Sequence, residues 1–112
     1  GASHLNQVCA VIPANSQITD VILNVTTAND DGAASSVSVG TIADANAFIN
    51  AQSVQALGTT HGVLDTEATN VGATDIQVLA DFTATTGDGT AGVGTVTVMY
   101  IQNNSVQDAA DL

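Results

Sequence analysis

The chain has 112 residues, with 11 acidic side chains and neither Lys nor Arg, so its formal net charge at pH 7 is -11. Proteins bind nucleic acids mainly through cations that neutralise phosphates, so this composition excludes an electrostatic nucleic-acid partner. Anionic membranes and phosphate-binding nucleotide sites are disfavoured for the same reason. Such a surface is typical of proteins in high salt, of proteins that repel other anionic surfaces, or of a fragment cut between two trypsin sites.

Hydrophobic residues make up 45% of the chain and its mean hydropathy is +0.28, which argues against intrinsic disorder despite the charge. The length fits one domain, which we place at residues 1–104, followed by a polar acidic tail at residues 105–112. No apolar run approaches the roughly 18 residues of a membrane-spanning helix, so we expect no membrane partner.

The N-terminal half predicts three strands. Residues 8–12 are apolar, and Pro13 ends this first strand because proline removes a backbone donor. Residues 18–26 alternate between apolar and polar side chains, as a half-buried strand does. A turn of the Asp-Gly type at residues 28–32 leads to a third strand at residues 35–42. We expect the second and third strands to form a hairpin.

The middle of the chain alternates less regularly. Asp44 is placed to cap a short helix near residues 44–50, which Phe48 would anchor to the core. Residues 53–57 predict a short strand, and residues 58–72 predict mostly loop.

The C-terminal half repeats the arrangement of a strand, a turn and a strand. Residues 75–83 alternate, residues 85–90 form a Gly-rich turn, and residues 94–102 form the last strand. Met99 and Ile101 lie on the face opposite its other apolar residues. We therefore expect both faces of this strand to be covered, by the sheet partner or by another subunit.

This spacing of strands and turns predicts the fold class. It favours an all-β chain that forms a single β-sandwich or jelly-roll-like domain of about six to eight short antiparallel strands. At most one short helix is expected, near residues 44–50.

Few residues are suited to catalysis, and we expect no enzymatic activity, no catalytic residues and no cofactor. His4 lies close to the N-terminus, and His61 lies near Asp65 and Glu67. A metal site formed by His61, Asp65 and Glu67 is one interpretation, and a solvated or interface loop is the simpler one. Cys9 is the single cysteine, and its apolar stretch predicts a small buried residue.

Calcium is the better metal candidate, because it prefers oxygen ligands. The weak candidates are Asp30 and Asp31 in one turn, and Asp44 and Asn46 in another. A helix-loop-helix calcium site needs a central Gly and a terminal Glu, which residues 44–55 lack. Asp-rich turns also form for backbone reasons, so we assign no metal.

Sugar binding is weakly supported by the runs of Thr, Ser and Asn. Sugar sites usually add aromatic platforms, and the three aromatic residues, Phe48, Phe82 and Tyr100, all fall at expected core positions.

Three ordered motifs resemble small structural proteins of tailed bacteriophages. Residues 11–21 read Val-Ile-Pro-Ala-Asn-Ser-Gln-Ile-Thr-Asp-Val. A Val-Ser-Val-Gly-Thr segment at residues 37–41 precedes Asp-Ala-Asn-Ala-Phe at residues 44–48, and residues 92–100 end in Val-Met-Tyr. The resemblance implies a β-sandwich on a virion, often in a threefold assembly, without catalytic residues. The chain departs from it with Asn15, where Gly is common, and in lacking basic residues.

The function that we expect is that of a capsid decoration (cement) protein, which stabilises the outer head surface through contacts between subunits. Its partners would be further copies, as a trimer, and the major capsid protein or another virion protein, at the virion surface. The alternative is a tail-fibre, knob or host-adhesion module that presents residues 58–72 to a receptor. A less favoured reading is an extracellular surface-layer or adhesin fragment from a high-salt organism.

Overall fold

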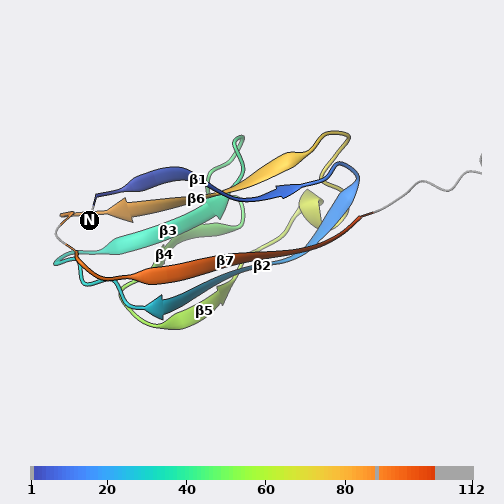
Figure 1. Ribbon diagram of the computed structural model, residues 1–112. Coiled ribbons are helices and arrows are strands. Elements are labelled where there is room, and N and C mark those ends of the chain that lie inside the picture. Colours follow the sequence, from blue (N-terminus) through green and yellow to red (C-terminus); the bar gives the residue numbers. More distant parts are fainter. Residues whose placement is uncertain (1, 88, 103–112) are drawn as a thin grey trace, which may run out of the picture.

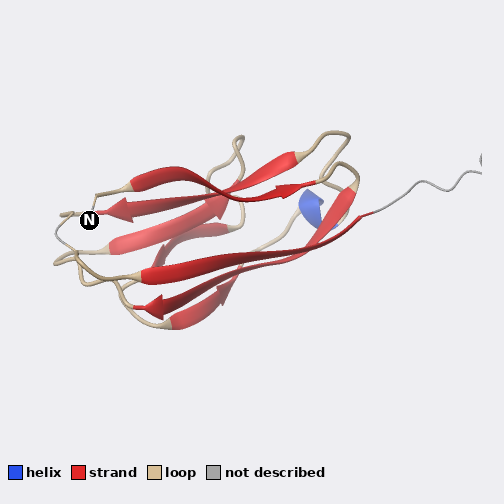
Figure 2. Cartoon of the chain, viewed as in Figure 1, coloured by secondary structure: helices blue, strands red, loops and turns tan. Residues whose placement is uncertain are grey.

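In a computed structural model, which describes residues 2–87 and 89–102, the chain forms two antiparallel sheets that face each other (Figures 1 and 2). This confirms the predicted all-β sandwich. One sheet has the strand order β1-β6-β3-β4 and the other has the order β5-β2-β7. The elements are β1 (His4–Ile12), β2 (Ser16–Thr27), β3 (Ser35–Gly40), β4 (Ile49–Ser53), β5 (Gly58–His61), the 3-10 turn η1 (Thr66–Ala68), β6 (Ile76–Ala84) and β7 (Val93–Gln102).

The predicted hairpin between the second and third strands is wrong, and the strand–turn–strand arrangement of the C-terminal half is not a hairpin either. The strands β2 and β3 follow each other in the chain but belong to different sheets, and so do β6 and β7. Instead β2 pairs with β7 and β5, while β6 pairs with β1 and β3. The segments 28–34 and 85–92 therefore cross from one sheet to the other, at the same end of the sandwich (Figure 1).

The middle of the chain also differs from the prediction. No helix lies at residues 44–50, because the chain turns back tightly over Gly40 before β4 begins. A Cβ atom on Gly40 would lie 2.1 Å from the carbonyl oxygen of Asp44, so only glycine fits there. Instead of one strand at residues 53–57, β4 ends at Ser53 and β5 begins at Gly58. The predicted tail at residues 105–112 lies outside the described residues.

The central strand of the smaller sheet contains a β-bulge that the sequence pattern explains. Ile18 and Val21 are both fully buried although they are three residues apart, which a regular alternation does not allow. The structure resolves this in β2, where Ile18 faces Tyr100 and Asp20 faces Met99, so that Thr19 is the extra residue.

The core lies between the sheets and is built from small and medium aliphatic side chains with one aromatic ring, Phe48. Its buried members are Ile12, Ile18, Val21, Leu23, Val25, Val39, Phe48, Ile49, Val54 and Val78. Phe82 is half-buried and Tyr100 is 44% exposed, so the expectation that all three aromatic rings lie in the core holds only for Phe48. Met99 and Ile101 are 51% and 54% exposed, so the second face of β7 is not covered by residues 2–87 and 89–102.

Candidate functional site

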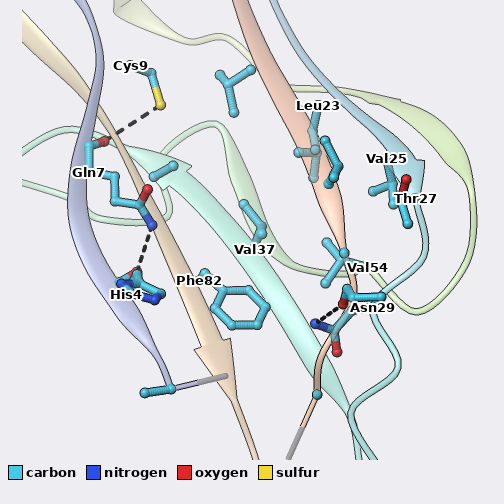
Figure 3. Close-up of a pocket in the computed structure, with 18 of the residues that line it drawn as sticks. His4, Gln7, Cys9, Leu23, Val25, Thr27, Asn29, Val37, Val54 and Phe82 are labelled. Atoms are coloured by element: carbon cyan, nitrogen blue, oxygen red, sulfur yellow. Dashed lines mark hydrogen bonds between the residues drawn. The ribbon is translucent and has the colours of Figure 1, made fainter. Parts of the chain in front are cut away.

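An apolar cleft of about 510 Å³ lies between the two sheets on the side where β1 and β7 form their edges. Both sheets contribute its walls: Val37 and Phe82 come from the larger sheet, and Leu23 and Val25 from the smaller one (Figure 3). Core side chains therefore line a hollow on this side. We call the exposed surface of β1 and β7, together with this cleft, the β1–β7 flank.

The β1–β7 flank holds most of the exposed large hydrophobic side chains. Ten such side chains are exposed among the described residues, and seven of them belong to these two strands. They are Leu5, Val8 and Val11 on β1, and Val93, Met99, Tyr100 and Ile101 on β7. Isolated exposed hydrophobic residues are ordinary, but a group on adjoining edges marks a contact surface.

The same flank carries no acidic residue, although the whole chain has 11 of them. Neither His4–Ile12 nor Val93–Gln102 contains Asp or Glu. Two acidic side chains lie on the neighbouring strands: Asp81 on β6 accepts a hydrogen bond from the Asn6 amide of β1 (2.6 Å), and Asp20 on β2 lies opposite Met99 and contacts His61. The two strands are therefore richer in exposed apolar side chains and poorer in negative charge than the rest of the surface.

The first pair of calcium candidates has a structural role instead. The carboxylate of Asp31 is buried and accepts hydrogen bonds from the amides of Ala33 (3.2 Å) and Gly87 (3.1 Å) and from the Thr86 hydroxyl. It therefore joins the two segments that cross between the sheets. A carboxylate whose oxygens are already satisfied by protein donors is poorly placed to take up an ion.

Asp30 holds the segment just before β7. Its carboxylate accepts hydrogen bonds from the amides of Thr90 (2.6 Å) and Ala91 (2.9 Å) and from the Thr90 hydroxyl (2.8 Å). The Ala91 amide, followed by the two Thr90 donors, lowers the pKa of Asp30 because these bonds favour the charged form.

The second pair of calcium candidates lies at the other end of β3. Asp44 accepts a hydrogen bond from the Asn46 amide (3.4 Å), and both residues are exposed within the turn. This local bond shapes the turn around Gly40. The structure does not bring the two pairs together, since one precedes β3 and the other follows it.

The histidine candidates are also separated. His61 lies on β5, and its Nδ1 atom is 3.0 Å from a carboxylate oxygen of Asp20. Asp65 and Glu67 contact each other beside η1, where the Asp65 amide donates to Glu67 (3.4 Å). No group of three or more metal-ligating side chains gathers within residues 2–87 and 89–102.

Cys9 is exposed on β1, so the prediction of a buried residue is wrong. Its side chain lines the cleft, and its Sγ atom lies 3.6 Å from the Gln7 carbonyl oxygen (Figure 3). Partial burial raises the pKa of the thiol more than a hydrogen bond to the Ala80 backbone lowers it. A raised pKa keeps the thiol protonated and slow to react at neutral pH.

Sequence reasoning missed the cleft and the contribution of β1 to it. The one available signal was the apolar character of both faces of β7, where Met99 and Ile101 remain exposed among the described residues.

Within the described residues, no helix has the length and apolar character that spanning a membrane requires. No family model, no curated protein and no solved structure matches this chain.

Proposed function

We propose that this domain is a structural protein that attaches to a larger assembly, and specifically a decoration protein on the outer surface of a phage capsid. The observation that carries the proposal is the β1–β7 flank, because its seven exposed hydrophobic side chains lie on strands without a single acidic residue. Assembly would cover these side chains and the strand edges beside them. The resemblance of residues 11–100 to phage structural proteins supplies the kind of assembly.

The distribution of charge supports an outward-facing position. With no Lys or Arg, the domain cannot neutralise packaged nucleic acid, and its acidic surface would keep neighbouring particles apart. Contact with a shell protein would instead use the uncharged flank.

The experiment is rebinding of the purified domain to particles from which it has been stripped. We expect the domain to rebind at hundreds of copies per particle and to restore resistance to heat. Failure to rebind, or rebinding without any gain in resistance, contradicts the decoration role. A copy number of a few to tens per particle favours a tail location instead.

A matched pair of variants connects this experiment to the flank. Leu5→Asp places a charge on β1, where the side chain is 62% exposed, and should abolish rebinding. Leu57→Asp makes the same substitution at a side chain that is 67% exposed but lies outside the flank, next to β5, and should leave rebinding intact. Equal loss in the two variants would mean that the flank is not the attachment surface.

The alternative, a receptor-binding module, is favoured by one observation. A second hollow of about 630 Å³ is lined by Glu67, Asn70 and Val71 of the 58–72 segment, together with Ile42 and Asp75. No aromatic side chain lines it, so a sugar would lack a stacking platform there. A glycan array at micromolar concentrations of the domain tests this alternative, and specific binding that Glu67→Ala removes would support it.

A further inference from the structure

The free edge of β7 differs from the other strand edges of the molecule. β4 and β5 have five and four residues, which is short for an edge that must bind another strand. β1 has nine residues, but its register shifts twice and Asn6 has a φ of 55°. Both short length and irregularity are ways in which natural proteins block pairing at an edge.

β7 has none of these protections. Each of its ten residues, from Val93 to Gln102, faces a residue of β2, and both register shifts fall in β2. The strand contains no proline and no charge. At about 3.3 Å per residue, it presents a straight edge of about 33 Å.

Charge decides which kind of partner fits this edge. Two copies of the chain carry -11 each and have no Lys or Arg with which to form an ion pair. They can approach only where neither copy presents a carboxylate, and β7 offers that along its whole length. Its outward residues Thr95 and Thr97 are uncharged, and Met99 and Ile101 are about half exposed.

We propose that β7 pairs edge to edge with β7 of a second copy, antiparallel and across a two-fold axis. The three-stranded sheet β5-β2-β7 would continue into its symmetry mate. With the axis at Thr97, Met99 and Ile101 of each copy would lie opposite Thr95 and Val93 of the other. Because β1 and β7 run along the same side of the sandwich (Figure 1), the axis would also bring the two β1 strands close together over the mouths of both clefts. This pairing uses the same β1–β7 flank as the proposed attachment to a shell protein, so the two contacts exclude each other and the dimer is the form expected of the free domain. It replaces the expected trimer with a dimer.

The interface predicts an unusual response to salt. Interfaces that contain ion pairs weaken as salt rises, whereas this one lacks cations and is opposed only by repulsion between the two acidic bodies. Dimerisation should therefore tighten by tenfold or more between about 0.02 M and 0.5 M NaCl, where the screening length falls from about 20 Å to about 4 Å.

Sedimentation velocity of the whole chain tests the proposal, with a reductant present so that Cys9 cannot cross-link copies. We expect a monomer–dimer equilibrium that shifts toward the dimer with rising salt. Thr97→Asp places a carboxylate on β7 and should weaken dimerisation at least tenfold. Thr59→Asp makes the same change on β5, at the far edge of the same sheet, and should leave the dimer nearly unchanged.

Amide hydrogen exchange in the unmutated chain gives a second measurement that requires no variant. The outward amides of β7 should gain protection as the protein concentration rises through the dimerisation range, while the amides of β4 and β5 should not. A chain that stays monomeric at high concentration and high salt overturns the proposal. A trimer, a dimer that loosens with salt, or concentration-dependent protection confined to another strand overturns it as well.

Discussion

The two sides of the sandwich, the β4–β5 flank and the β1–β7 flank, differ in how their strand edges and the core behind them are covered. On the β4–β5 flank the edge strands are short and the chain closes the gap itself. Phe48 and Val54 are buried there, and the amide of Val63 donates to the carbonyl oxygen of Phe48 (2.9 Å). The amide of Gly62, just after β5, donates to the carbonyl oxygen of Val21 on the neighbouring strand β2 (2.6 Å), so residues 62 and 63 connect the two sheets. On the β1–β7 flank the edge strands are long and core side chains line an open cleft.

This difference in how the two flanks are covered predicts which substitutions change folding stability and which change association. The β4–β5 flank is complete within one molecule, so changes there act on folding. The β1–β7 flank is open among the described residues, so we expect changes there to act on association with little effect on folding.

The largest effect should follow from truncating the ring of Phe48, which is 3% exposed. Phe48→Ala should lower the free energy of unfolding by about 3–5 kcal/mol, because it removes buried area and leaves a cavity. Tyr100→Ala truncates another aromatic ring, but on the β1–β7 flank at 44% exposure, and should cost under about 1.5 kcal/mol. Urea unfolding of both variants measures the contrast. Equal losses would show that the two flanks do not differ in this way.

A smaller loss is expected when the buried carboxylate of Asp31 is removed. The Gln55 side chain, which follows β4, also donates to the Asp31 carbonyl oxygen (3.0 Å), so this residue belongs with the β4–β5 flank. Asp31→Ala should cost about 2–3 kcal/mol, because it removes the buried, charged acceptor that joins the two crossing segments. Asp44→Ala, at an exposed turn, should cost under about 0.5 kcal/mol in the same thermal or urea assay. A neutral Asp31→Ala would mean that the crossing segments do not depend on this carboxylate.

The smallest effect concerns Asp30, which anchors the segment before β7. Its pKa in the folded chain lies below the ordinary value of 3.8, so its contribution to stability is fully present above that value. The contribution is lost as the pH falls through the lower, folded-state pKa. The difference in unfolding free energy between the wild type and Asp30→Asn should therefore be constant near neutral pH and shrink below about pH 4. A difference that grows on acidification would contradict this sign.

The sequence predicted the strands better than their partners. Alternation between apolar and polar residues located β2, β3, β6 and β7 to within about two residues. Alternation reports which face of a strand is buried but carries no information about which strand lies beside it. The Asp-Gly pattern at residues 28–32 therefore predicts a hairpin turn. In the structure, Asp30 and Asp31 instead stabilise the connections that run between the two sheets.

The candidate site was predicted only in part. The second apolar face of β7 indicated a missing cover, and the exposed Met99 and Ile101 agree with that signal. The apolar sequence of β1 predicts a buried Cys9. The position of β1 at the edge of its sheet leaves the residue exposed. Asn15 has a φ of 60°, a conformation that asparagine tolerates, so an asparagine can take the place of a glycine in the turn between β1 and β2.

The order of strand pairing also governs when the chain can fold during synthesis. Ile12 pairs with Ile76, and Ser16 pairs with Gln102, so the earliest strands in each sheet find their partners among the latest. Contacts between such distant residues require closing long loops first, which slows folding. On the ribosome, the smaller sheet cannot be completed until residue 102 has left the exit tunnel. The emerging chain must then remain soluble through its own negative charge until that moment.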